Sequence, residues 1–398
     1  MRIAMLGWEF PTFISGGLGV HCYELTQAIC RLGVEVDFFM PLSGKMVHTS
    51  CQGLRIIEVA KTELRPYLFI SKKGQPAGYG QHLIRAVEEY AARCADAVFE
   101  ENKARRYDVL HAHDWLTAGA ASGAKAKTAL PLVQTFHSTE YDRTSWPWDY
   151  ILSIERAAAQ RADLIIAVSR RTREQAARLG ADRAKVRVVY NGVDAAKYSC
   201  AKLPPQLEEF KKRQRVVLFL GRLTEQKGPV QFLHAAKKVL LACPDTLFVV
   251  AGKGEMLSLL INMSLELGIS KNVRFLGYVP EDDQQRIYKM ADVYVMPSTS
   301  EPFGITALEA MSSGVPVIIS KTSGVAEIAK SAIKVDFWDI NAMAQKIIAV
   351  LRYRPLSDAL SRLSCEEAKA YTWARAAQDT LLVYAEALRM PKRNYSSP

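Results

Sequence analysis

Short apolar runs of four to seven residues recur along the chain and alternate with longer amphipathic stretches. Uninterrupted apolar runs of this length are typical of strands buried on both faces, as in parallel sheets. We therefore expect strands at Arg2–Gly7, Val34–Met40, Val109–Ala112, Leu132–Phe136, Leu164–Val168 and Val186–Tyr190, then at Val216–Leu220, Thr246–Ala251, Val273–Leu276, Val293–Met296 and Val315–Ile319.

The intervening stretches have helical periodicity. Residues 20–32 place Leu25, Ala28 and Ile29 on one side, and Gly33 follows as a residue that commonly ends a helix. Repeated strand–helix alternation predicts an α/β protein with doubly wound parallel sheets.

The strands form two series, divided at about residues 195–212. Pro204-Pro205 and a charged run in this segment indicate a linker. We therefore expect two Rossmann-like domains that face each other across a cleft. Their ligands should bind at the carboxyl ends of the strands.

Composition and charge exclude some classes of protein but do not identify the function. The 398 residues are 49% apolar and 23% charged, as in ordinary globular proteins, which excludes collagen-like and disordered classes. No apolar run approaches the roughly 18 residues of a membrane span. The apolar start of the chain is too short for a signal peptide, so we expect a cytoplasmic protein.

The seven cysteines lack C-x-x-C spacing, so neither a disulfide framework nor a zinc site is expected. The net charge of +11 suits nucleic acid, an anionic membrane surface or a phosphorylated substrate. The basic clusters lack interleaved aromatic residues, so nucleic acid is not an expected partner.

The glycine-rich segment Ser15-Gly16-Gly17-Leu18-Gly19 lies between the first strand and the first helix. Glycines there let backbone amides approach a phosphate at a helix N-terminus. A nicotinamide-binding motif needs a different spacing, and it needs an acidic residue where the second strand ends at Met40-Pro41. The alternative is a tight turn without a ligand.

The segment His111-Ala112-His113-Asp114-Trp115 lies at a strand end. Its polar groups suit hydrogen bonding to a polar substrate, or they are structural. Two histidines at i and i+2 also suit a metal ion, but no third ligand is evident, so no metal is expected.

Two charged motifs follow strands of the second series. In Gly221–Gly228, Arg222 and Lys227 can converge on a diphosphate and neutralise a leaving nucleotide without a metal. In Glu301–Met311, carboxylates at positions 301 and 309 can accept hydroxyl hydrogen bonds while loop amides bind phosphate. The alternatives are a solvated loop and a pair of surface glutamates.

Together these motifs resemble the retaining GT-B glycosyltransferases, specifically glycosyltransferase family 4 and its glycogen and starch synthase relatives. The most specific element is the pair Glu301 and Glu309, which have seven residues between them. Gly221-Arg222 and Lys227-Gly228 precede this pair along the chain. The resemblance covers the whole chain. It implies an N-terminal domain of residues 1–194 plus 372–398 and a C-terminal domain of residues 195–371.

The resemblance also implies roles for individual residues. Catalytic roles fall to His113, which would contact the donor sugar, to Arg222 and Lys227, which would hold the diphosphate, and to Glu301, which would bind sugar hydroxyls. The expected donor-binding residues are Gly17, Gly19, Tyr278, Val279, Phe303, Gly304, Ile305 and Glu309, of which Glu309 would accept both ribose hydroxyls and Tyr278 and Val279 would flank the base.

The expected partners are a nucleotide-sugar donor, either a UDP- or an ADP-sugar, and a carbohydrate acceptor; no cofactor is implied. Acceptor-side residues are His137, Glu140 and Tyr141; the last two lie in the aromatic stretch Thr139–Tyr150, which serves either as an acceptor platform or as packing between the domains. A glucan or oligosaccharide acceptor is favoured. The alternatives are a lipid or cell-envelope acceptor at a membrane surface and a non-catalytic nucleotide-sugar binding protein.

Overall fold

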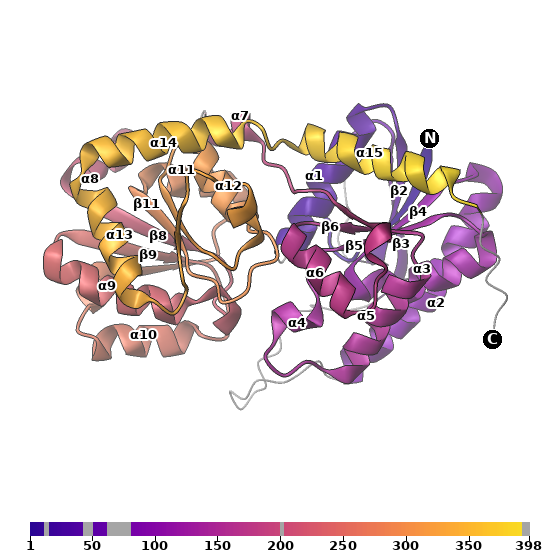
Figure 1. Ribbon diagram of the computed structural model, residues 1–398, viewed down its shortest axis with the longest axis horizontal. Helices are drawn as coiled ribbons and strands as arrows, with labels where there is room; N and C mark the ends of the chain where they lie inside the picture. The colour runs from indigo at the N-terminus through magenta and orange to yellow at the C-terminus, as the bar shows by residue number, and fades with distance from the viewer. Residues whose placement is uncertain (12–15, 43–50, 62–80, 200–202, 392–398) are drawn as a thin grey trace. The chain divides into compact units, whose positions relative to one another are not determined.

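The computed structural model describes residues 1–11, 16–42, 51–61, 81–199 and 203–391 (Figure 1). The chain forms two compact units. Unit 1 comprises Met1–Asn191 and the segment from Trp373 onward, and unit 2 comprises Gly192–Thr372. Each unit is built on its own parallel sheet.

The described part of unit 1 contains a seven-stranded sheet with the order β3-β2-β1-β4-β5-β6-β7. All its strand pairs are parallel. The central strands are buried because helices cover both faces, although β4 and β5 each carry two polar side chains. The strands are β1 (Arg2–Leu6), β2 (Glu35–Leu42), β3 (Leu54–Lys61), β4 (Val109–His113), β5 (Leu132–Phe136), β6 (Leu164–Ala167) and β7 (Val186–Val188).

The helices of unit 1 lie between successive strands, and one comes from the end of the chain. They are α1 (Gly17–Arg31), α2 (Gln81–Arg105), α3 (Asp114–Thr128), α4 (Glu140–Arg143), α5 (Asp149–Arg161), α6 (Arg170–Arg178), the short 3-10 helix η1 (Arg183–Lys185) and α15 (Trp373–Arg389).

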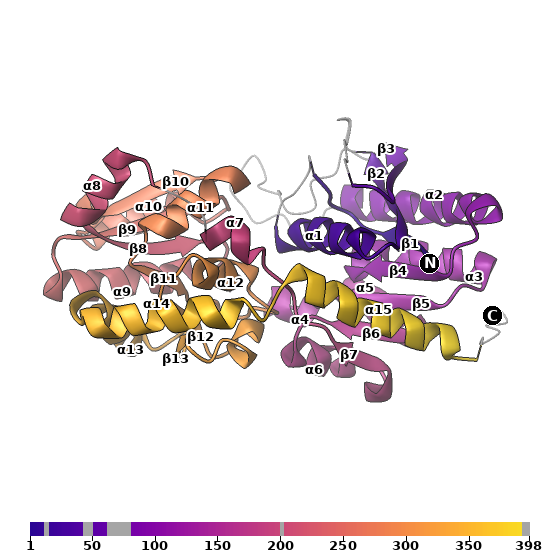
Figure 2. The ribbon, with the colours of Figure 1, turned by 90° about the horizontal axis from the view of Figure 1, so that it is seen from above.

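Helix α15 packs along α1 and against β4, β5 and β6, as Figures 1 and 2 show. Its Tyr384 is buried, and the tyrosine hydroxyl lies 2.6 Å from His111 Nδ1. The other ring nitrogen of His111 lies 2.7 Å from the Thr135 hydroxyl. One histidine therefore links the last helix to two neighbouring strands.

The described part of unit 2 contains a six-stranded parallel sheet with the order β10-β9-β8-β11-β12-β13. Its strands are β8 (Arg215–Leu220), β9 (Thr246–Ala251), β10 (Val273–Gly277), β11 (Val293–Met296), β12 (Val317–Ser320) and β13 (Ile333–Val335). Its longer helices are α7 (Ala195–Ser199), α8 (Pro205–Arg213), α9 (Pro229–Ala242), α10 (Leu257–Glu266), α11 (Glu281–Met290), α12 (Ile305–Ser312), α13 (Ile340–Arg352) and α14 (Arg354–Ala368). Single 3-10 turns are η2 (Glu225–Lys227), η3 (Ser270–Asn272) and η4 (Gly324–Glu327).

The predicted fold class is confirmed, and each predicted strand is present within one or two residues at its ends. The edge strands β3 and β13 were not predicted. The linker prediction is wrong: residues 195–199 and 205–213 are helical and belong to unit 2. Pro205 stands at the start of α8, where its missing N–H and fixed φ favour helix initiation instead of interrupting a helix.

Candidate active site

In unit 2, the loops that follow β8, β9 and β11 meet at the carboxyl edge of the sheet. Glycines make this approach possible. A Cβ at Gly228 (φ 71°) would lie 2.1 Å from the Pro297 carbonyl oxygen, and one at Gly252 (φ 139°) would lie 1.8 Å from the Gly221 oxygen. Side chains at these positions would force the loops apart. The Thr299 amide also donates a 2.9 Å hydrogen bond to the Gln226 carbonyl.

The central feature of this edge is the pair formed by Lys227 and Glu301. Lys227 Nζ donates to Glu301 Oε2 at 2.6 Å, and the buried Ser298 hydroxyl lies 3.3 Å from the same oxygen. The Glu301 side chain is 8% exposed, and that of Lys227 is 21% exposed. The structure therefore brings together two of the predicted catalytic residues and leaves part of the ammonium accessible.

The segment after Glu301 leads into α12. Val325 donates from its amide to the Phe303 carbonyl at 2.7 Å, and Gly324 donates to the Glu301 carbonyl at 2.8 Å. Gly304 has φ 107°, and a Cβ there would lie 2.8 Å from Met296 Cε. The amides of Phe303, Gly304 and Ile305 therefore stand in a fixed loop at the start of a helix, a geometry suited to an anion.

Glu309 lies on α12 and is buried. The Tyr288 hydroxyl donates to Glu309 Oε2 at 2.7 Å, and the Tyr198 hydroxyl is a second hydrogen-bond partner. Burial raises the pKa of the Glu309 carboxyl, and these tyrosine hydrogen bonds oppose the rise. The tyrosines hold the carboxylate in one orientation, and it keeps further acceptor capacity.

The remaining predicted residues of unit 2 lie on the neighbouring loops. Tyr278 is exposed and Val279 is buried, directly after β10. Lys253 Nζ lies 5.4 Å from the centre of the Tyr278 ring. Arg222 is half-buried in the same loop as Lys227. These placements are compatible with the predicted donor contacts, which stay predictions.

In unit 1, the glycine-rich motif opens α1 as the sequence indicated. Gly16 is the N-cap in an extended conformation, Gly17 is exposed and Gly19 is buried in the first turn. Ser15, the first residue of the motif, lies outside the described residues.

The histidines of unit 1 form a group that the sequence pattern only partly revealed. His113 Nδ1 lies 3.0 Å from His137 Nε2, and the ring of His21 lies beside both, with ring centres 5.5 and 4.2 Å away. His21 comes from α1, His113 from the end of β4, and His137 follows β5. His21 was missed because it lies inside a helix, far along the chain from the other two.

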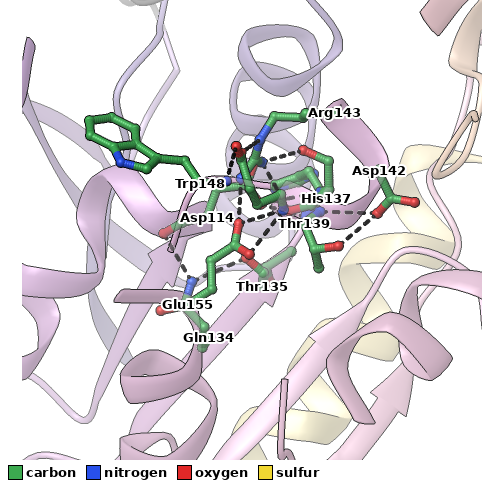
Figure 3. Close-up of polar contacts among 11 residues, drawn as sticks. Asp114, Gln134, Thr135, His137, Thr139, Asp142, Arg143, Trp148 and Glu155 are labelled. Atoms are coloured by element: carbon green, nitrogen blue, oxygen red, sulfur yellow. Dashed lines mark hydrogen bonds and ion pairs between the residues drawn. The ribbon is translucent and has the colours of Figure 1, made fainter. Parts of the chain in front are cut away.

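Asp114 contacts this histidine group through the backbone of His137. Its carboxylate accepts from the amide of His137 at 2.6 Å, as Figure 3 shows. The residue is buried and has φ 55°, a left-handed conformation that costs a non-glycine residue energy. Burial raises the pKa of the Asp114 carboxyl to about 7, although nearby Arg143 and the accepted amide hydrogen bonds oppose the rise.

The predicted acceptor-side residues have unequal surroundings. Glu140 is buried: Arg143 Nε donates to Glu140 Oε2 at 3.1 Å and the Trp148 amide to Oε1 at 3.3 Å. The Arg143 guanidinium also pairs with the buried Glu155 (Figure 3). The Tyr141 ring is covered by the Arg178 guanidinium at 4.1 Å. Glu140 thus serves a local ion-pair network, and an acceptor contact by these residues stays a prediction.

Between these residues and the next helix, the chain presents aromatic side chains to solvent. Trp146 is 89% exposed and Trp148 is 37% exposed. The Tyr150 hydroxyl donates to Glu88 at 3.0 Å. Trp146 is the side chain in this stretch that is best placed to offer a free ring face to a sugar.

Comparison with known proteins identifies the class. Residues 15–197 match the family model "Glycosyltransferase Family 4", and residues 205–364 match "Glycosyl transferases group 1". The chain is 30% identical to an uncharacterized glycosyltransferase of Methanocaldococcus jannaschii, over 99% of this chain and 100% of that protein. It is 27% identical to the glycogen synthase of Mycobacterium tuberculosis, over 98% and 95% of the two chains.

Among solved structures, Anabaena HepE in complex with UDP-glucose matches with a TM-score of 0.75 at 18% identity, covering 97% of this chain and 100% of that one. The chain belongs to the family 4 glycosyltransferases and has the GT-B architecture. No helix in the described part of the chain is long and apolar enough to cross a membrane.

Proposed function

We propose that this glycosyltransferase moves a hexose, most simply glucose, from a nucleotide diphosphate sugar to a glucan or oligosaccharide with retention of anomeric configuration. The observation that carries the donor part is the Lys227–Glu301 pair, fixed at the carboxyl edge of the unit 2 sheet beside the loop amides that open α12. The similarity to a glycogen synthase supports the acceptor part.

In this proposal the donor diphosphate binds Arg222 and Lys227. Lys227 is already oriented by Glu301, so its ammonium needs little reorganisation to meet an anion. The amides of Phe303 to Ile305 add donors for phosphate oxygens. Glu309 accepts ribose hydroxyls, and Tyr278 and Val279 flank the base.

The catalytic step is departure of the nucleoside diphosphate. Negative charge grows on the bridging oxygen as the glycosidic bond breaks, and two cations next to the diphosphate stabilise that charge. No protein nucleophile is assigned: the acceptor hydroxyl attacks the same face and its proton passes to the departing phosphate. Glu301 and His113 hold the sugar hydroxyls during this step. In this scheme no metal or other cofactor is required.

Product analysis tests this proposal. The purified chain is incubated with UDP-glucose or ADP-glucose and a malto-oligosaccharide, and the products are followed by mass spectrometry and proton NMR. We expect an oligosaccharide longer by one glucose whose new anomeric proton has the α configuration. A β-linked product would overturn the retaining mechanism, and an unextended acceptor with both donors would overturn the glucan assignment.

The alternative acceptor, a lipid or cell-envelope molecule, is favoured by one observation, the net charge of +11. A basic protein is attracted to anionic lipid surfaces, and this attraction weakens with salt. Sedimentation with phosphatidylglycerol vesicles separates the two cases. Salt-sensitive binding to anionic vesicles and none to phosphatidylcholine vesicles would favour the lipid acceptor. An absence of binding at low salt would count against it.

A non-catalytic nucleotide-sugar binding protein is the third case. It would bind a donor without releasing a nucleoside diphosphate, and Glu301→Ala would then leave every measured rate unchanged.

A further inference from the structure

Three imidazoles from separate segments converge at the carboxyl edge of the unit 1 sheet. One nitrogen from each of His21, His113 and His137 lies within 4.8 Å of the other two. His21 and His113 are buried, and His137 is half-buried. Their elements, α1, β4 and the segment after β5, adjoin strands that are neighbours in the sheet, β1-β4-β5.

The hydrogen bonds around His21 prepare one of its nitrogens as a ligand. His21 Nδ1 lies 2.8 Å from Asn191 Oδ1, which only accepts, so Nδ1 carries the proton and Nε2 carries the lone pair. Nε2 is buried and has no hydrogen-bond partner among the described residues. A metal-bound histidine commonly has this arrangement, with its second nitrogen fixed by an oxygen.

His113 is in a similar state. A hydrogen bond between His113 Nδ1 and His137 Nε2 uses one nitrogen of each ring. It leaves His113 Nε2 buried and without a partner among the described residues.

We propose that His21, His113 and His137 bind a divalent transition metal ion of the zinc class, with the remaining coordination positions open to water or to an oxygen of a bound molecule. Three imidazole nitrogens favour zinc, cobalt or nickel over calcium or magnesium, which prefer oxygen ligands. The sequence predicted no metal because His111 was the visible partner of His113. The fold instead occupies both nitrogens of His111 with Tyr384 and Thr135 and brings His21 and His137 to His113.

The metal site does not depend on the proposed sugar transfer. The two are nevertheless linked through His113, which is also the residue proposed to contact the donor sugar. A bound metal ion would occupy that imidazole, so zinc is expected to compete with the donor sugar and raise its apparent KM.

Cobalt binding to the full chain tests the site directly. Co²⁺ bound by three imidazoles in a four- or five-coordinate site gives visible d–d absorption that is far more intense than that of the hydrated ion. We expect one such Co²⁺ per chain, displaced by one equivalent of Zn²⁺. We also expect Zn²⁺ to raise the Tm of the wild-type chain by mass action. Absence of both the absorption and the Tm shift in the wild-type chain would overturn the proposal without reference to any variant.

Variants locate the site. His21→Gln and His137→Gln are each expected to weaken Co²⁺ binding more than tenfold. Asn191→Ala, which removes the oxygen that fixes His21, should weaken it about 10- to 100-fold. His234→Gln is the matched control because His234 is exposed on α9 in unit 2, and it should bind as the wild type does. The proposal fails if both ligand variants keep wild-type affinity, or if His234→Gln alone loses the signal.

Discussion

Lys227 and Glu301 show how one charged pair can prepare a site. Each lies on a loop at the carboxyl edge of the unit 2 sheet, and their 2.6 Å contact fixes the ammonium before any donor binds. Both residues were predicted from sequence, because charged residues in glycine- or proline-containing loops after buried strands are a local pattern. Their direct contact was not, because it depends on how the two loops pack.

Lys227→Ala is expected to lower turnover roughly 10- to 150-fold, since it removes a charge-assisted contact worth about 1.5–3 kcal/mol in the transition state. Arg222→Ala should act in the same direction. Initial-rate measurement of nucleoside diphosphate release provides the check. Lys237→Ala, an exposed lysine on α9, is the matched control and should keep the wild-type rate. Near-normal turnover in both loop variants would remove this loop from the mechanism.

The carboxyl of Asp114 gives a pH-dependent test. Its folded pKa of about 7 lies above the ordinary value of 3.8, so the folded state holds the proton more tightly than the unfolded state does. This contribution to stability is full below about pH 4 and is lost as pH rises through 7. The Asp114→Asn variant does not titrate there. We expect the free energy of unfolding to rise less from pH 5 to pH 8 in the wild type than in Asp114→Asn.

Urea unfolding of both proteins at the two pH values measures that difference. Because the other titrating groups are common to both chains, their contributions largely cancel. Equal pH dependence in the two proteins would show that the carboxyl is ionised at pH 5 and would contradict the account of its surroundings.

At the scale of elements, strand and helix positions followed from the apolar runs and the periodicity between them. The edge strands β3 and β13 were missed because β3 mixes polar residues into its apolar pattern and β13 has only three residues. The linker prediction failed because a proline pair was interpreted as a break, although Pro205 begins a helix. Such errors arise where tertiary packing decides the conformation of a weak local pattern.

Helices α2 and α3 illustrate packing that no local pattern indicates. A Cβ at Gly119 would lie 3.1 Å from Ala91 Cβ, and one at Gly123 would lie 2.9 Å from Ala95 Cβ. The two helices approach closely because their facing residues are small.

Gly123→Val should therefore destabilise the protein by about 1–3 kcal/mol, because the branched side chain would force the helices apart. Ala126→Val is the matched control: Ala126 is exposed on α3, so the same new side chain costs only helix propensity, less than about 0.7 kcal/mol. The midpoints of urea unfolding report both effects. A Gly123→Val midpoint equal to that of Ala126→Val would contradict the close packing of α2 on α3.

At the scale of the molecule, the sequence indicated the family because its motifs lie at strand ends throughout the chain. The histidine group could not be predicted from the sequence. His21, His113 and His137 become neighbours only because β1, β4 and β5 are adjacent in the sheet although they are not consecutive along the chain. The signal that could have found them is a histidine at or just after the carboxyl ends of β4 and β5, together with one in the helix that follows β1.

Because these histidines are buried, we expect the folded chain to lose stability in acid. Burial lowers the pKa of His21 to about 4 and that of His111 to about 3, below the ordinary 6.5. Their contribution to the free energy of unfolding is present above pH 6.5. It is lost as pH falls, by about 2 kcal/mol per histidine at pH 5. Asp114 titrates in the opposite sense, so Asp114→Asn should be more acid-sensitive than the wild type. Tm values from pH 7.5 to pH 5 provide the check, and a Tm independent of pH in the variant would contradict the burial of these rings.

The central claim is that this glycosyltransferase uses a nucleotide sugar to extend a glucan. The most direct measurement is nucleoside diphosphate release from a panel of UDP- and ADP-sugars, with and without glycogen or malto-oligosaccharide. The account predicts release from one donor, stimulated by the glucan and strongly reduced in Lys227→Ala. Release that glucan does not stimulate would contradict the acceptor, and an absence of release from every donor in the panel would contradict the proposed donor chemistry.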